Sequence, residues 1–501
     1  MAGRRFKEIL SGPLPARPAG ESDCAALAAE SRSPAGQAGS GLVGIFSSPS
    51  SGTIFRSCRT SRQGPIPHHV GWKAPLAVAC VVLALEAILA WSVGIGRPFR
   101  GDEPHFVETI IQFGTRPLNL DLLTHYNEMS GPVPFVLYGT WGRVFGFDPQ
   151  VLRLFSIVVA LATYVLWYWF LHSETGSRRL AAGGTAFVAL HPYMLYLSVF
   201  VYTDMLAILC LIGALIAVRR ERPLALAAFL CAAVLNRQYL IFGTAAAGCY
   251  FLARYWQTRE RRDALSIIAV AGSTLPLAAL CLLWRGLCPD GALKQVYFDQ
   301  HLAFHVPSLV LYVSLAALYL APVLMFRWRE FFSQQAGCAP NFTGRIPAAA
   351  ALLLSGLYFF YPVAPSRSAV EAGICQVGML HQTLHRLFAS SLVEQAAFFC
   401  GFVIGIAVVA KIVLDTAARW RRGGIDFQFF LDLNVILFLA VMPFSYLHWE
   451  KYFMPLVPVL LLRIGYVPFR IGKAAAQSRE GSTAPSVVSL RVAEHVAHRA
   501  A

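Results

Sequence analysis

The chain has 501 residues, of which 56% are hydrophobic and only 14% are charged, and its mean hydropathy is +0.55. Soluble globular proteins carry about 25% charged residues, so this composition excludes an ordinary soluble protein and indicates a polytopic membrane protein. The formal net charge is +15, but the basic residues lie in short clusters between apolar segments. That distribution is typical of membrane orientation signals, and we expect no nucleic-acid partner.

The two ends of the chain differ in composition from its middle. Residues 1–70 are rich in Ser, Gly, Ala, Pro and Arg and lack a long apolar run. We therefore expect a disordered cytoplasmic tail and no secretory signal there. Residues 471–501 have the composition of a second cytoplasmic tail. The sequence thus predicts one membrane domain, residues 71–470, between two tails.

About twelve apolar segments of this domain are candidate membrane spans, because a helix needs about 20 apolar residues to cross a bilayer. We therefore expect an all-α fold, a polytopic bundle of membrane helices. Lys and Arg are concentrated in every second loop, as at 219–222, which is typical of a chain with both ends in the cytoplasm. The candidate spans lie near residues 74–95, 150–172, 180–200, 203–218, 224–236, 239–255, 265–284, 307–326, 346–362, 395–413, 427–446 and 452–467.

The longest loop on the outside, residues 96–149, directly follows the first span. Within it, 103–114 places Phe106, Val107, Ile110, Ile111 and Phe113 at the spacing of one helix face. Residues 133–146 are apolar and aromatic but too short to cross the membrane. The pattern predicts two helices that lie along the membrane surface.

Two adjacent carboxylates, Asp102 and Glu103, stand at the start of this loop, within residues 100–105. In the plain structural interpretation, Asp102 caps the helix that begins near Glu103, and Glu103 is only solvated. In the catalytic interpretation, a carboxylate at the membrane surface accepts the proton of a reacting hydroxyl. The residues by themselves leave both interpretations open.

Polar residues also stand at the outside ends of later spans. Asp204 begins one span, and Arg237 and Gln238 lie between two short ones. Ionisable groups at such depth are costly and mark candidate functional sites. Arg237 could bind the phosphate of a lipid, or it could snorkel to the headgroups.

Two further clusters precede later spans. His301 and His305 would share one face of a helix, but no third ligand is near. We therefore favour hydrogen bonding to a substrate or an interfacial role, and we expect no metal. Lys451, next to Glu450, could hold a phosphate or could form a salt bridge with its neighbour.

The order of these clusters over residues 74–467 resembles that of polytopic GT-C glycosyltransferases, and most of all the dolichyl-phosphate-glucose alpha-1,2-glucosyltransferases. Asp102-Glu103 with His105 is similar to the family's Asp-Glu segment with a following His. Tyr202-Thr203-Asp204 is similar to its Tyr-Thr-Asp. The other resemblances are residues 129–138 to Thr-Pro-Pro-Gly-Leu-Tyr, 236–238 to Phe-Arg-Gln, 301–307 to a His-x-Pro approach, and 450–455 to Glu-x-Arg-Tyr-x-x-x-Pro. The chain departs from the family at Pro132-Val133-Pro134 and at Lys451, which stands near the family's Arg.

The resemblance implies an inverting enzyme that moves glucose, in alpha-1,2 linkage, from a dolichyl- or polyprenyl-phosphate sugar to a lipid-linked oligosaccharide during assembly of the N-glycan precursor. Asp102 would be the general base, with Glu103 as the close alternative, and Arg237 or Lys451 would hold the phosphate. The other residues expected to bind substrate are His105, Asp204, Gln238, His301, His305 and Glu450. The resemblance implies no cofactor and a place in the endoplasmic reticulum membrane, or in the inner membrane of a bacterium.

Two other functional classes fit parts of the pattern. A transporter or lipid flippase would account for many spans and buried charges. It does not account for a long outside loop with paired carboxylates, and transporters often contain internal repeats that are not evident here. A non-catalytic membrane subunit is the second alternative.

Overall fold

The computed structural model of the protein describes residues 73–289, 303–333, 345–365, 370, 377–445 and 448–466. All regular secondary structure among these residues is helical, which confirms the expected all-α fold. The chain of helices begins with α3 (Lys73–Val93), α4 (Glu103–Thr115), α5 (Leu120–His125), α6 (Pro132–Phe145), α7 (Pro149–Thr175), α8 (Arg178–Ala189) and α9 (Pro192–Val199). It continues with α10 (Asp204–Arg219), α11 (Pro223–Val234), η1 (Gln238–Leu240), α12 (Ile241–Thr258) and α13 (Arg261–Trp284). Its last part contains α15 (Val306–Leu318), α16 (Ala321–Ser333), α17 (Arg345–Ser355), α18 (Leu357–Phe360), α20 (Met379–Phe388), α21 (Ser391–Arg422), α22 (Phe427–Val441), η2 (Met442–Phe444), η3 (Glu450–Phe453), α23 (Leu456–Leu461) and η4 (Leu462–Tyr466).

Fewer of these helices are long enough to span a membrane than the twelve expected from the sequence. By length and composition, five described segments qualify: Ala74–Val93, Pro149–Thr175, Arg261–Trp284, Ser391–Arg422 and Phe427–Phe444. The number rises to seven if two bent helix pairs, α8 with α9 and α15 with α16, each count as one span. Other expected spans correspond to short helices such as α10, with 16 residues, and α11, with 12. At about 1.5 Å per residue, these are shorter than the roughly 30 Å hydrocarbon core.

The two bent pairs fall where the sequence predicted continuous spans, 180–200 and 307–326. The axes of α8 and α9 differ by 73°, and those of α15 and α16 by 80°. Pro192 begins α9, and a proline ends the preceding helix because it lacks a backbone N–H and clashes with the previous turn. The His191 side chain caps the new helix by accepting the Tyr193 backbone N–H at 3.2 Å.

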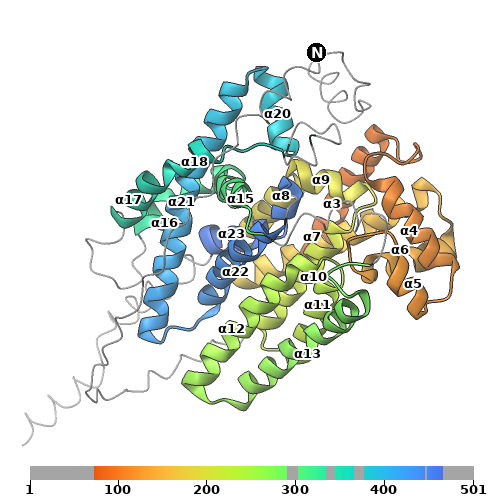
Figure 1. Ribbon diagram of the computed structural model, residues 1–501, viewed down its shortest axis with the longest axis horizontal. Helices are drawn as coiled ribbons and strands as arrows, with labels where there is room; N and C mark the ends of the chain where they lie inside the picture. The colour runs from red at the N-terminus through yellow and green to blue at the C-terminus, as the bar shows by residue number, and fades with distance from the viewer. Residues whose placement is uncertain are drawn as a thin grey trace, which may run out of the picture.

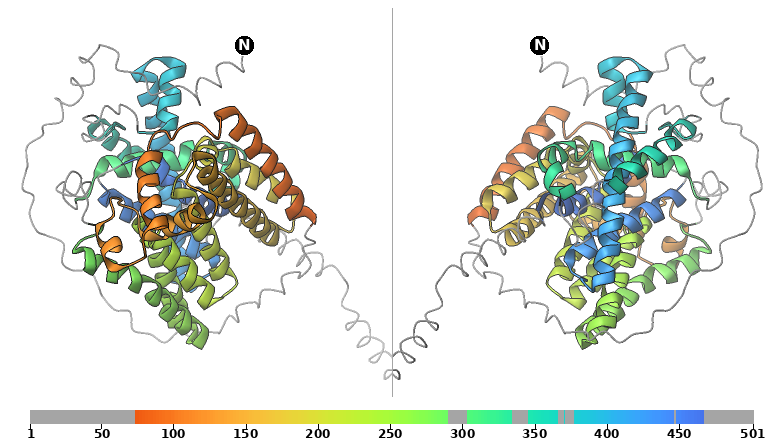
Figure 2. Two further views of the ribbon diagram at one scale, coloured as in Figure 1. Left: turned by 90° about the vertical axis from the view of Figure 1, so that its right-hand side faces the viewer. Right: turned by 90° about the vertical axis from the view of Figure 1, so that its left-hand side faces the viewer.

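The helix α3 lies at the edge of the bundle (Figures 1 and 2), where it packs on α7 and α9. Its outer face exposes the apolar side chains Val81, Ile88 and Trp91. Such a face is stable against lipid rather than water. This geometry agrees with the expectation that the first candidate span lies in a membrane.

The loop between α3 and α7, which the sequence predicts on the outside, contains the two expected helices, α4 and α6, and a short third one, α5, that the sequence did not predict. In Figure 1 the three lie together at one side of the bundle. Gly114 and Gly139 allow α4 and α6 to approach closely, because a Cβ atom on either glycine would lie 2.8 Å from the backbone of the other. Ile111 was expected on the buried face of α4, but it is 39% exposed.

The helix α10 lies inside the bundle, with nearly all of its side chains buried. Asp204 is its first residue, and Arg219 is its last. Arg254 and Arg262 pair with Glu221 just beyond this last turn, at 2.9 and 2.6 Å. The basic loops therefore lie at the opposite end of α10 from Asp204, as the loop charges predicted.

Candidate active site

Charged residues from four distant parts of the chain lie together at the Asp204 end of α10. The turn after α3 carries Asp102, and α10 begins with Asp204. Arg237 lies between α11 and η1, and Lys451 lies in η3. The structure thus brings together four of the residues that the sequence marked as separate candidates.

An ion pair joins the beginning of this site to its end. The Lys451 ammonium donates to Oδ2 of Asp102 at 2.9 Å, and the two side chains are 15% and 53% exposed. Lys451 lowers the pKa of Asp102 below its ordinary value, and Arg237 and His105 act in the same direction. Asp102 is therefore a charged, accessible carboxylate. Asp102 occupies the expected N-cap position of α4, but its side chain makes no capping hydrogen bond to this helix.

Glu103, the neighbouring carboxylate, has a different environment. It is completely buried, and it binds Arg153 through two hydrogen bonds, Nε to Oε1 at 3.0 Å and Nη2 to Oε2 at 2.6 Å. The backbone N–H groups of Val201 and Arg100 also donate to its oxygens, at 3.0 and 2.9 Å. The expectation of a solvated Glu103 is therefore wrong. With both oxygens occupied, Glu103 is placed to hold the turn that presents Asp102.

A second buried ion pair stands beside the first. Arg237 donates from Nη2 to Oδ2 of Asp204 at 2.7 Å, and Asp204 has no exposed surface. Oδ1 of Asp204 and Nε of Arg237 are buried, and neither has a hydrogen-bond partner in the described part of the chain. Arg237 therefore keeps donor capacity that could bind an anion. It does not snorkel away from the bundle, because only 8% of its surface is exposed.

Aromatic rings connect the two pairs. The Tyr452 ring centroid lies 5.6 Å from Nζ of Lys451 and 5.9 Å from Cζ of Arg237. The Tyr202 ring lies 5.6 Å from Lys451, and the Phe106 ring lies 6.0 Å from Arg237. Rings at such distances attract cations through their π faces. Lys451 and Arg237 therefore lie beside the same ring, that of Tyr452, close enough for both positive charges to act on one bound anion.

Glu450, expected to bind substrate, instead connects parts of the protein. It is fully buried, accepts the Tyr319 hydroxyl at 2.6 Å, and accepts the backbone N–H groups of Leu380 and His381 at 2.8 and 2.9 Å. These N–H groups belong to the first turn of α20, which has no partners within its own helix for them. The contacts favour a structural role for Glu450 at the N-terminus of α20.

The remaining expected residues differ in their placement. His105 is exposed on the first turn of α4. Gln238 donates from Nε2 to the carbonyl oxygen of Met129 at 2.7 Å. His305 donates its backbone N–H to Pro443 at 2.6 Å, and its Nε2 is buried without a hydrogen-bond partner among the described residues. His301 lies outside the described residues, so the proposed histidine pair is untested.

Two residues near the site were missed by the sequence reasoning. Arg153 stands near the beginning of an apolar span, and a basic residue at such a position indicates pairing with a buried acid. Glu128 lies in the loop before α6 and is 8% exposed. No pattern marked Glu128, because a single carboxylate in a polar loop is ordinary. Only the fold places it near the charged pairs.

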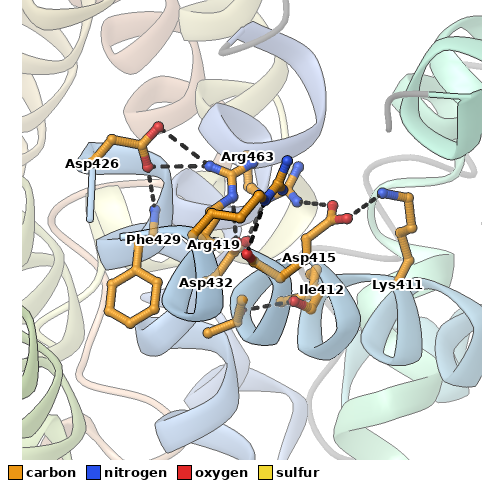
Figure 3. Close-up of polar contacts among 11 residues, drawn as sticks. Lys411, Ile412, Asp415, Arg419, Asp426, Phe429, Asp432 and Arg463 are labelled. Atoms are coloured by element: carbon orange, nitrogen blue, oxygen red, sulfur yellow. Dashed lines mark hydrogen bonds and ion pairs between the residues drawn. The ribbon is translucent and has the colours of Figure 1, made fainter. Parts of the chain in front are cut away.

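A second group of charged residues lies elsewhere in the bundle. Figure 3 shows its members, which come from α21, α22, η4 and the turn before α22: Lys411, Asp415, Arg419, Asp426, Asp432 and Arg463. Arg463 binds both Asp415, at 2.6 Å, and Asp432. Three cations and three carboxylates alternate, so the buried charges compensate one another. We assign this group a structural role, holding η4 against α21 and α22.

The chain has little similarity to known proteins. No family model matches the chain, and no curated protein matches its sequence. Among solved structures, the chain is similar to the crystal structure of ArnT from Cupriavidus metallidurans in the apo state, with 14% sequence identity, 78% of each chain covered and a TM-score of 0.33. This similarity is too low to assign an activity, so the assignment rests on the residues themselves.

Proposed function

We propose that the protein is a membrane glycosyltransferase of the GT-C class, which moves a sugar from a polyprenyl- or dolichyl-phosphate to a lipid-linked acceptor. One observation carries the proposal: the contact between Asp102 and Lys451, with Arg237 beside it. Sugar transfer from a lipid phosphate needs a base for the acceptor hydroxyl and cations for the leaving phosphate. The ion pair places both kinds of group at one site.

The proposed reaction is a single displacement. The acceptor oxygen attacks the anomeric carbon, a new carbon–oxygen bond forms, and the bond from that carbon to the phosphate oxygen breaks. The hydroxyl proton passes to Asp102, and the electron pair of the broken bond stays on the phosphate. Lys451 and Arg237 stabilise the added negative charge. Attack from the face opposite the phosphate inverts the anomeric centre.

The contact between Lys451 and Asp102 also has a consequence for the order of events. While Lys451 holds Asp102, the lowered pKa makes this carboxylate a weak base. A lipid phosphate that binds Lys451 competes with Asp102 for the ammonium group. We propose that donor binding in this way raises the basicity of Asp102 shortly before it is needed.

The finer assignment follows the resemblance of the motifs. The donor would be dolichyl-phosphate-glucose, the linkage alpha-1,2, and the acceptor a lipid-linked oligosaccharide of the N-glycan precursor. The protein would then act in the endoplasmic reticulum membrane. In this assignment residues 1–70 and 471–501 are cytoplasmic tails. His105 and Gln238 border the proposed phosphate site and would contact the sugar or the acceptor.

The test measures sugar transfer in membranes that contain the full chain. Labelled dolichyl-phosphate-glucose is supplied with a lipid-linked oligosaccharide that lacks its terminal glucose, and the lipid product is analysed by mass. We expect Asp102→Asn to lower kcat by about 10²- to 10⁴-fold, as for loss of a general base. The control Asp121→Asn removes a carboxylate that is 78% exposed on α5, and it should leave kcat unchanged.

Two outcomes would contradict the proposal. If the wild-type protein transfers neither glucose nor mannose from its dolichyl phosphate, a transferase is excluded for these donors and the transporter class is favoured. If Asp102→Asn retains the wild-type rate, the site described above does not supply the base.

A further inference from the structure

Glu128 stands on a loop that is fastened to the segment carrying Arg237. We call residues 126–133 and residues 235–238 together the clasp. Three hydrogen bonds join its two segments: Gly131 N to Asn236 O at 3.1 Å, Val133 N to Leu235 O at 3.3 Å, and Gln238 Nε2 to Met129 O at 2.7 Å. The clasp therefore fixes where the Glu128 backbone lies relative to Arg237.

The Glu128 side chain is buried in an unusual way. Only 8% of the residue is exposed, and its Oε1 atom is buried without a hydrogen-bond partner in the described part of the chain. A buried carboxyl oxygen without a partner costs free energy, and a carboxyl group lowers this cost by taking up a proton. This differs from Glu103 and Asp204, each of which is bound directly by an arginine.

Charged groups from several elements face Glu128. Arg237, between α11 and η1, and Lys451, in η3, are positively charged, and both favour the ionised form of the Glu128 carboxyl group. Asp102, just before α4, and Glu108, within α4, are negatively charged, and their repulsion opposes ionisation of Glu128. Burial has the largest effect and raises the pKa of Glu128 to about 7, whereas Lys451 lowers the pKa of Asp102 below its ordinary value. Two carboxyl groups at one site thus have pKa values that are pushed apart, which is typical of acid and base pairs in enzymes.

We propose that Glu128 is the second proton-accepting carboxyl group of the site, which receives from Asp102 the proton released by the acceptor hydroxyl. This inference rests on the proposed function and deepens it. In the first step, the hydroxyl proton passes to Asp102 as the sugar–phosphate bond breaks. In the second, the O–H bond on Asp102 breaks, a bridging water takes up that proton and gives up another, and an O–H bond forms on the Glu128 carboxylate. A water is needed because no hydrogen bond joins these two side chains in the described part of the chain. Asp102 is again ionised and ready for another acceptor.

The charge balance of the site supports this transfer. A lipid-phosphate sugar carries one negative charge, and the lipid phosphate that leaves carries two once the hydroxyl proton has moved to the protein. Protonation of Glu128 removes one negative charge at the same time, so the net charge near Arg237 and Lys451 stays constant. A buried site resists changes in net charge, because the low dielectric makes each uncompensated charge costly.

The experiment compares Glu128→Gln with the wild-type full chain in membranes, using dolichyl-phosphate-glucose and the lipid-linked acceptor from pH 5 to 9. For the wild type, kcat/KM should rise with pH until about 7 and then level off, because only ionised Glu128 can accept a proton. Glu128→Gln should lower kcat at pH 8 by at least about tenfold, leave the donor KM within about twofold, and abolish the rise near pH 7. The control Asp121→Asn should keep the wild-type profile.

A second readout does not depend on sugar transfer. The C=O stretch of the protonated Glu128 carboxyl group is isolated in the infrared difference spectrum between the wild type and Glu128→Gln, and this difference band should titrate near pH 7. Should Glu128→Gln fail to reach the membrane, Glu128→Asp takes its place. A rise in kcat/KM that moves to another pH in Glu128→Asp supports the inference, and a rise that does not move overturns it.

The failure of this inference can be told from the failure of the proposed function. A wild-type protein that transfers glucose while Glu128→Gln keeps both the rate and the rise near pH 7 overturns only the role of Glu128. A slower Glu128→Gln that still shows the rise overturns it too, since another group then titrates. A wild-type protein without any transfer overturns both.

Discussion

Arg153 donates hydrogen bonds to both carboxylate oxygens of Glu103 inside the protein, whereas the side chain of the adjacent Asp102 is accessible to solvent. Neither Arg153 nor Glu103 has exposed surface, whereas the side chain of Asp102 is 53% exposed. Gly101, in the left-handed region at φ 59°, turns the chain just before these two carboxylates. The ion pair thus anchors the second residue of the acidic motif, Glu103, while the first, Asp102, stays accessible.

This division of roles predicts that two substitutions of glutamate in α4 differ strongly in their effect on stability. Glu103→Gln leaves the Arg153 charge buried without its partner, which should lower the free energy of unfolding by about 3–5 kcal/mol. Glu108→Gln, at an exposed position of the same helix, should change it by less than about 0.5 kcal/mol. Thermal unfolding of the purified protein measures both. A Glu103→Gln variant that is as stable as the wild type would show that the pair is dispensable.

A second prediction concerns the buried pair of Arg237 and Asp204. Arg237→Met alone leaves the Asp204 carboxylate buried and unpaired, so we expect a strong loss of stability. The double variant Arg237→Met/Asp204→Asn removes both charges and should recover much of that stability. It should still bind the donor poorly, with a raised KM, because the proposed phosphate ligand is gone. Recovery of both stability and donor affinity in the double variant would argue against a phosphate at Arg237.

The third prediction is a dependence of stability on pH at the start of α20. His381 accepts the Val377 backbone N–H at Nδ1 (3.3 Å), and its Nε2 lies 3.0 Å from Glu394, so the neutral ring fits this site. Burial lowers the pKa of His381, and Glu394 offsets this only in part. The unfolded chain then binds more protons than the folded one below about pH 6.5, so stability falls as the pH falls through this range.

His381→Gln keeps a donor for Glu394 but cannot titrate. Its thermal unfolding temperature should therefore depend less on pH below about 6.5 than that of the wild type. The exposed His125→Gln variant, on α5, serves as the matched control. An equal loss of stability with acid in the wild type and in His381→Gln would assign the effect to another group.

The fourth prediction tests the close approach within the clasp. A Cβ atom added at Gly131 would lie 2.0 Å from the carbonyl oxygen of Leu235, a distance that real Cβ atoms do not reach. Gly131→Ala should therefore displace the loop that carries Glu128 and lower the rate of sugar transfer by more than tenfold. Gly183→Ala, on α8, meets no atom within 4 Å and should stabilise its helix by up to about 1 kcal/mol. Transfer assays and thermal unfolding of the two variants check this contrast.

The positions of many helices could be predicted from the sequence, because periodicity and helix-ending residues act locally. Examples are α4, with its beginning at Glu103, and α6. The number of spans could not be predicted in this way. Composition alone does not distinguish a helix that crosses a bilayer from one like α10, which is short and buried by its neighbours on all sides.

The sequence by itself determined the helical class, the apolar character of the bundle, the opposite placement of basic loops and acidic motif, and most members of the site. Only the tertiary structure decided which polar residues meet. Lys451 reaches Asp102 across 349 positions of the chain, and Glu128 joins them without any motif of its own. The physical reason is that a local pattern reports the preferences of one helix. Burial and the pairing of charges depend on which helices pack together.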